Sequence, residues 1–169
     1  LKGFSGASEV GFYAVGNRFI MPITIAITTG LRAVFPFMTK TFQADKGKFN
    51  VKLVQSFSVV FIVGSSIATL LSLSSGFLLP AFFGEEYKKT ILVFSYQAWF
   101  GVLLSFDLLL STVLSSTYKQ IILAILTTID VLILFPLMYY GAKQGAEAMA
   151  AAKLIGAFIS VAYHIIVVI

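Results

Sequence analysis

Two aspartates stand inside long apolar segments, and their carboxyl groups are the first candidates for chemistry. Asp107 lies near the middle of the apolar segment 91–116, and Asp130 lies near the middle of the segment 120–140. Burying a charge at the centre of a bilayer costs at least about 2.5–3.5 kcal/mol, so each carboxyl group should face a partner or a wet cavity. We therefore expect Asp107 and Asp130 to be sites of ion or proton coupling.

A second polar group interrupts the apolar segment 10–36. Asn17 and Arg18 lie about a third of the way along it, and Arg32 lies close to its far end. At 3.6 residues per turn the two arginines fall within about 40° of one helix face. We expect Asn17, Arg18 and Arg32 to bind an anionic group of a substrate. An alternative stays open, in which Arg18 forms a packing ion pair with an aspartate and Arg32 reaches the lipid headgroups.

The remaining ionisable residues predict no catalysis. His164, the single histidine, is expected to be either a hydrogen-bonded core residue or a proton relay, and Lys153 is expected to reach water. The chain has no cysteine, which excludes disulfides and thiolate metal sites. It also has no phosphate-binding glycine loop, nucleophile motif or metal-ligand spacing. We expect no catalytic residue, no metal and no cofactor, and hence no enzyme.

The elements that must position these residues are apolar helices. Hydrophobic residues make up 59% of the 169-residue chain and charged residues only 11%, against roughly 45–50% and 25% in soluble domains. The apolar runs are longer than strands and show no period-two alternation. The sequence therefore predicts an all-α, polytopic transmembrane bundle of about five helices. The expected helices are 10–36, 53–83, 91–116, 120–140 and 146–169.

The lysines predict how this bundle is oriented. The expected loop 37–52 contains Lys40, Lys46, Lys48 and Lys52 against one acid, Asp45. Because positive charge favours the cytoplasmic side, this loop is expected inside the cell. The net charge of +5 is spread over such connecting segments rather than along an aromatic-lined stripe, so we expect no nucleic-acid partner.

Four short patterns resemble motifs of one transporter family. Residues 7–14 (ASEVGFYA) are similar to an "evGxYxxA" helix start, and Pro36 with the basic stretch to residue 49 is similar to the family's next cytoplasmic connection. Residues 83–87 (FGEEY) resemble an outer "FGxxY" turn, and residues 140–148 resemble a "yGxxGAAxA" turn.

In this order, the motifs resemble the O-antigen and exopolysaccharide flippases of the multidrug/oligosaccharidyl-lipid/polysaccharide exporter superfamily. The resemblance implies that residues 1–169 form about five helices of a six-helix half. They would be a fragment of the C-terminal transmembrane bundle of a longer transporter, with the N-terminal bundle as partner. It implies a multi-pass protein of the bacterial cytoplasmic (inner) membrane. It also implies the flipping of an undecaprenyl-diphosphate-linked oligosaccharide, with membrane lipid as the surrounding partner and Arg18 as the candidate diphosphate contact.

Two other functions stay open on the same residues. A cation-coupled multidrug exporter of the same superfamily would depend first on Asp107 and Asp130. A non-transporting membrane scaffold would use every buried charge for packing. Asp130 also departs from the family pattern, because members more often carry an amide in that stretch.

Overall fold

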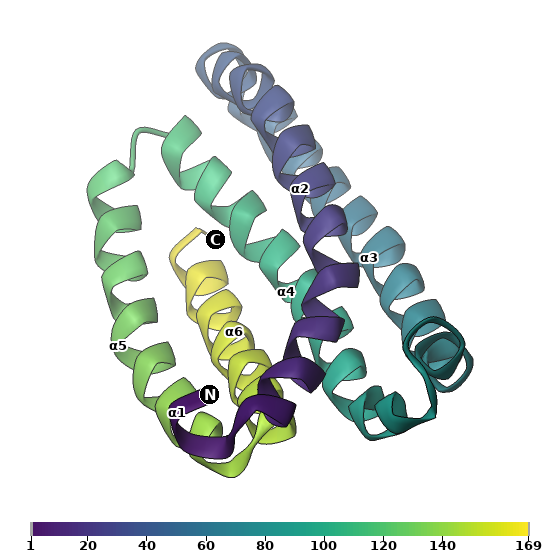
Figure 1. The fold of residues 1–169 in the computed structure, drawn as a ribbon. Helices are drawn as coiled ribbons and strands as arrows, with labels where there is room; N and C mark the ends of the chain where they lie inside the picture. Colours follow the sequence, from purple (N-terminus) through teal and green to yellow (C-terminus); the bar gives the residue numbers. More distant parts are fainter. Residues whose placement is uncertain (1, 169) are drawn as a thin grey trace.

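The chain is built from helices alone in the residues that the structure describes. The computed structural model describes residues 2–168, together with their side chains except those of residues 2, 28 and 31–33. The elements are α1 (Lys2–Ser5), α2 (Ala7–Ala44), α3 (Lys46–Phe83), the 3₁₀ helix η1 (Glu85–Thr90), α4 (Ile91–Ser116), α5 (Gln120–Gln144) and α6 (Ala146–Val168) (Figure 1). The predicted all-α bundle is confirmed.

Five of these helices are long and apolar enough to cross a membrane, as in a multi-pass membrane protein. Their outward faces are strongly apolar: α3 and α5 expose most of their large hydrophobic side chains, among them Leu73 at 80% and Phe135 at 71%. In water such a surface would drive aggregation, whereas lipid solvates it.

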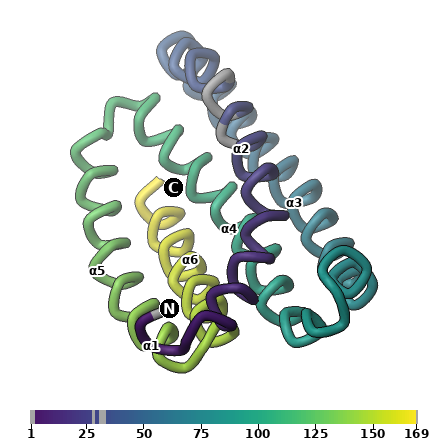
Figure 2. Tube along the Cα trace, in the orientation of Figure 1, coloured from purple at the N-terminus to yellow at the C-terminus, as the bar shows by residue number. Residues whose placement is uncertain are grey.

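Helix α4 is the centre of the bundle. It packs against α2 and α3 on one side and against α6 on the other, while α5 is attached mainly through α6 (Figure 1, Figure 2). The side chains of Phe94, Leu109 and Leu110 on α4 are almost fully buried. Because α4 has neighbours on two sides, a polar residue on it faces a different set of helices according to its position around the axis.

The predicted loop 37–52 is wrong, because this stretch is helical almost throughout. Helix α2 continues to Ala44 and α3 begins at Lys46, so a single residue joins them. Asp45 adopts an extended conformation, and its side chain accepts a hydrogen bond from the Lys48 N–H at 3.1 Å, which caps α3. Lysine, alanine and glutamine all favour helices, so the polar composition of the stretch did not make it a loop.

The resulting hairpin is longer than a bilayer is thick. Helices α2 and α3 have 38 residues each, which corresponds to about 57 Å per helix, against a hydrocarbon thickness of about 30 Å. The lysine-rich tip of the α2–α3 hairpin therefore extends past the apolar layer into the headgroups and water.

The other turns are short, and special backbone conformations make them. Gly84 and Gly145 have φ angles of +100° and +117°, which favour glycine, and they end α3 and α5. Helix α5 consequently reaches Gln144 rather than the expected 140. Between α4 and α5, Tyr118 has a φ of +61°, and its hydroxyl accepts a hydrogen bond from Gln43 Nε2 of the hairpin at 2.5 Å.

Candidate functional site

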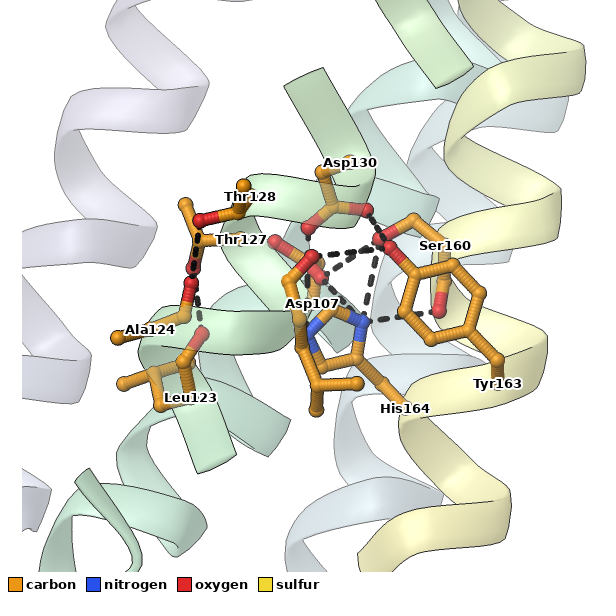
Figure 3. Close-up of polar contacts among 10 residues, drawn as sticks. Asp107, Leu123, Ala124, Thr127, Thr128, Asp130, Ser160, Tyr163 and His164 are labelled. Atoms are coloured by element: carbon orange, nitrogen blue, oxygen red, sulfur yellow. Dashed lines mark hydrogen bonds and ion pairs between the residues drawn. The ribbon is translucent and has the colours of Figure 1, made fainter. Parts of the chain in front are cut away.

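Five polar side chains from three helices converge inside the bundle. Asp107 comes from α4, Asp130 from α5, and Ser160, Tyr163 and His164 come from α6 (Figure 3). Figure 3 shows the aspartates, the serine, the tyrosine hydroxyl and the imidazole pointing toward one another. We call these five residues the Asp–His cluster. Asp107 and Asp130 lie away from the ends of spans that could cross the membrane.

Asp107 and Ser160 hold one edge of the imidazole. The Ser160 hydroxyl donates to Asp107 Oδ1 at 3.2 Å, and Asp107 Oδ1 lies 3.5 Å from His164 Nδ1. His164 Nδ1 also lies 2.9 Å from the Ser160 backbone carbonyl. Because a carbonyl oxygen can only accept, this contact is a hydrogen bond in the tautomer that carries the proton on Nδ1.

The other edge of the imidazole faces Asp130. His164 is 1% exposed, and its Nε2 has no hydrogen-bond partner among the described residues. Asp130 Oδ2 lies 4.0 Å from His164 Nε2, within ion-pair distance. If Nδ1 carries the proton of a neutral imidazole, Nε2 carries a lone pair, and this lone pair faces the Asp130 carboxylate. This arrangement leaves a place between two acceptors that suits a cation.

Tyr163 fixes the second carboxylate. Its hydroxyl donates a short hydrogen bond to Asp130 Oδ1 and lies 3.3 Å from the Leu126 carbonyl. Its ring stacks on the His164 ring, with centroids 4.9 Å apart and planes inclined by 23°. Tyr163 therefore orients both Asp130 and the imidazole.

Helical periodicity brings these groups together on α6. Ser160 and His164 are four residues apart, so they lie on one face, and Lys153 falls on the same face seven residues before Ser160. On α4 the same argument places Asp107 with Phe100. Both faces line a cavity of about 150 Å³ beside the Asp–His cluster. Its lining is Phe100, Leu104, Asp107, Asp130, Leu134, Gly156, Ala157 and Ser160.

Lys153 lies near the end of this cavity away from the imidazole. Its Nζ is 4.0 Å from the centroid of the Phe100 ring, which places the ammonium group over an aromatic face rather than free in water. The expectation that Lys153 reaches water is corrected accordingly: its side chain is half-buried. The cavity thus has a cation beside its Phe100 end and two carboxylates at the other.

The Asp–His cluster has the ligand atoms that a small cation requires. Two carboxylates within a membrane span require compensating positive charge. Asp107, Asp130 and His164 each offer one ligand atom, and these atoms lie within 4.8 Å of one another. A proton or a small metal ion could therefore be held between them. The Ser160 hydroxyl also lies 3.2 Å from His164 Nδ1, but it donates to Asp107, and the same nitrogen contacts the Ser160 carbonyl at 2.9 Å. The hydroxyl is therefore not arranged to give its proton to the imidazole, as an activated nucleophile would.

The structure does not bring the predicted cationic residues to this cluster. Asn17 is half-buried and Arg18 is exposed, and both are on α2, which packs on the other side of α4. Arg18 forms no salt bridge with any residue whose side chain is described. The interpretation of Arg18 as the ion-pair partner of an aspartate is therefore wrong. The side chain of Arg32 lies outside the described residues.

Sequence reasoning found the two aspartates but missed what holds them. Ser160 and Tyr163 were not singled out, and His164 was not connected with either carboxylate. The sequence of α6 could have indicated part of the cluster. Residues 163 and 164 follow residue 160 by three and four positions, so all three share one helix face. The partners across helices could not be found this way, because the sequence does not state how the helices are rotated against one another.

Comparison of the chain with protein-family models, with curated proteins and with solved structures gives no match. The function is therefore inferred from the residues of the chain and their geometry.

Proposed function

We propose that this chain is part of a cation-coupled membrane transporter that flips an undecaprenyl-diphosphate-linked oligosaccharide across the bacterial cytoplasmic membrane for surface polysaccharide synthesis. The observation that carries the proposal is the Asp–His cluster, in which ionisable groups from three spans meet inside the bundle. Such groups are costly in a membrane and are found mainly along ion and substrate pathways.

Cation binding at this cluster would be coupled to helix packing. Asp107, Asp130 and His164 sit on α4, α5 and α6, so the charge state of the cluster changes the attraction among three helices. A ligand shifts a conformational equilibrium by its differential affinity for the two states. A cation held between both carboxylates would therefore favour the state in which α4, α5 and α6 stay together.

The choice of substrate rests on the resemblance and on two features that support it. The motif at 83–87 covers the end of α3 and the start of η1, and the motif at 140–148 covers the junction between α5 and α6. Both lie at the end of the bundle opposite the lysine-rich hairpin (Figure 1). In addition, an almost wholly apolar cavity of about 420 Å³ lies between α2, α3 and α4, which suits a hydrocarbon chain.

Arg18 remains the proposed contact for the diphosphate, with Asn17 next to it in the sequence and Arg32 further along α2. Its guanidinium is exposed and has no carboxylate partner within the described side chains, so it is available to an anionic group. A guanidinium matches phosphate oxygens in a two-pronged geometry that lysine does not offer.

The test is surface polysaccharide export in a bacterial strain that lacks its own flippase. Asp107→Asn and Asp130→Asn are expected to abolish export while leaving membrane insertion unchanged. Asp45→Asn is the matched control, because it makes the same chemical change at an exposed carboxylate that only caps α3. Dissipating the proton and the sodium gradient separately would identify the coupling cation. Full export by both cluster variants would exclude the coupling role.

A cation-coupled multidrug exporter is the second candidate, and the same carboxylates favour it. The two functions differ in cargo, so cells expressing the protein should be tested for drug accumulation as well. If the protein lowers drug accumulation and cannot restore polysaccharide export, the flippase proposal is excluded. If neither activity is present, a scaffold in which the cluster only joins helices is the better account.

A further inference from the structure

A second polar cavity lies at the hairpin end of the bundle, and the proposed transport mechanism does not use it. Its volume is about 320 Å³, and the α2–α3 hairpin, the α4–α5 turn and the last described turn of α6 enclose it. The residues used below are Lys46 and Asn50 of the hairpin, Lys119 of the turn, and Leu53 and Val168. We call it the hairpin cavity.

The lining of the hairpin cavity carries positive charge. Lys46 and Lys119 line it, and neither forms a salt bridge with a described residue. The nearby carboxylate of Asp45 is engaged instead by the Lys48 N–H at 3.1 Å and the Lys48 ammonium at 3.7 Å. The two cavity lysines are therefore available for an anion.

The backbone adds to this positive charge. Lys46 is the first residue of α3, and Lys119 is the N-cap of α5, which has no side-chain cap. The N-termini of two long helices thus lie beside the same cavity, and helix N-termini favour anions.

Much of the remaining lining of the hairpin cavity is apolar. Phe49 is buried, and it packs with Met38 and Val113 into a hydrophobic cluster that Leu53 and Val168 extend. A small soluble anion gains nothing from such a surface, whereas a hydrocarbon chain does. The lining therefore fits a molecule that is anionic at one end and apolar at the other.

The position of the cavity along the bundle agrees with this chemistry. Helix α4 ends beside it at Ser116 and α5 begins beside it at Gln120, and the hairpin tip borders it at Lys46. The ends of membrane spans lie at the depth of lipid headgroups. Basic pockets between helices at this depth hold anionic headgroups.

We propose that the hairpin cavity binds the phosphate group of a lipid between Lys46 and Lys119, with the adjoining hydrocarbon chain on Leu53 and Val168. Asn50, which also lines the cavity, is placed to donate to a phosphate oxygen. The site stands independently of the Asp–His cluster, because it shares no residue with it.

The experiment titrates the purified full protein in detergent with phosphatidylglycerol and with phosphatidylcholine of the same chains, and counts bound lipids by native mass spectrometry. The parental protein should bind phosphatidylglycerol more tightly. The double variant Lys46→Gln/Lys119→Gln should lose this preference by roughly 30-fold, as expected for two lysines near a headgroup. Lys46→Arg/Lys119→Arg should keep it, which also shows that the cavity tolerates substitution.

The matched control is Lys89→Gln/Lys143→Gln, which removes two exposed lysines at the opposite end of the bundle. An equal loss of preference in this control would overturn the proposal, because it would reflect net charge alone. Displacement of the bound lipid by inorganic phosphate at similar concentration would overturn it in favour of a soluble anion.

Two arms distinguish the sources of the lipid phosphate. Undecaprenyl diphosphate is added as a competitor. If it displaces phosphatidylglycerol at a lower concentration, and only when both lysines are present, the site binds a lipid-linked carrier. Failure to displace it supports a bulk phospholipid. Neither result depends on whether the protein exports polysaccharide, so failure of the proposed function would leave this test unaffected.

Discussion

Glu9 and Ala146 are 137 residues apart in the sequence, yet Glu9 Oε2 accepts a hydrogen bond from the Ala146 backbone N–H at 2.6 Å. The first turn of α6 has backbone N–H groups without partners inside the helix, and a carboxylate from α2 satisfies one of them. This bond, together with the bond from the Ser5 hydroxyl to the Ala142 carbonyl at 2.5 Å, ties the start of the chain to the α5–α6 turn.

Replacing Glu9 by alanine should therefore destabilise α6. The loss of an N-terminal cap costs about 1 kcal/mol, and the negative charge of Glu9 adds to this by its position at the helix N-terminus. Thermal unfolding of the protein in detergent measures the effect. Glu147→Ala is the control, since Glu147 is an exposed carboxylate in the same turn. Equal destabilisation by both variants would show that the Glu9 bond is not the cause.

The hydrogen bond between Tyr163 and Asp130 should be measurable as a coupling energy. A double-mutant cycle with Tyr163→Phe, Asp130→Asn and the double variant should give about 1–2 kcal/mol, the range for a charge-assisted bond between membrane helices. The cycle is read from unfolding by sodium dodecyl sulfate. Thr127→Val in place of Tyr163→Phe is the control, because the Thr127 hydroxyl bonds only within α5, to the Leu123 carbonyl at 2.9 Å. A coupling energy near zero would show that Tyr163 does not stabilise Asp130 through this hydrogen bond.

Gly141 should not tolerate a methyl group. A Cβ there would lie 2.8 Å from the Ala148 carbonyl oxygen and 2.9 Å from Met149 Cα, and backbone atoms cannot move aside cheaply. Gly141→Ala should cost about 1–3 kcal/mol of stability. In contrast, Gly76→Ala on α3, where nothing lies within 4 Å, should be neutral or stabilising by about 0.5–1 kcal/mol. Both are measured by thermal unfolding in detergent, and a harmless Gly141→Ala would contradict the close approach of α5 and α6.

The two ends of the bundle should be separable by cysteine labelling, because the chain has no cysteine of its own. Lys48→Cys at the hairpin tip should react with a membrane-impermeant maleimide only after the cells are broken. Glu86→Cys in η1 should react in intact cells. Both positions are exposed, so differences in labelling report sidedness. The reverse pattern would overturn the inward orientation expected from the lysines.

The fold was largely predictable because lipid imposes a simple rule. Each span must hide its backbone within one apolar helix of about 20 residues or more, so hydropathy alone located five segments. The ends were less predictable where polar residues also favour helix. At residues 37–52 only Asp45, with its capping side chain, interrupts the helix.

The sequence identified the two buried aspartates of the candidate site but not the residues that contact them. Asp107 and Asp130 were evident because burying a carboxyl group in an apolar membrane segment costs free energy. Their placement on either side of His164 depends on the rotation of α4, α5 and α6 about their own axes, which is set by packing between helices. The ion pair considered between Arg18 and an aspartate is not formed for the same reason, because α2 packs on a different side of α4.

Helix α2 carries one further consequence of its sequence. Pro22 and Pro36 lie within it, each four residues after an arginine, Arg18 or Arg32. A proline has no N–H for the carbonyl four residues earlier, so the backbone carbonyl of each arginine loses its helical donor. The helix thus contains two hinges, and each one is adjacent to a cationic residue. Bending at Pro22 would change the direction of Arg18 relative to α4 without breaking a helical hydrogen bond from residue 22, because proline has no N–H to donate.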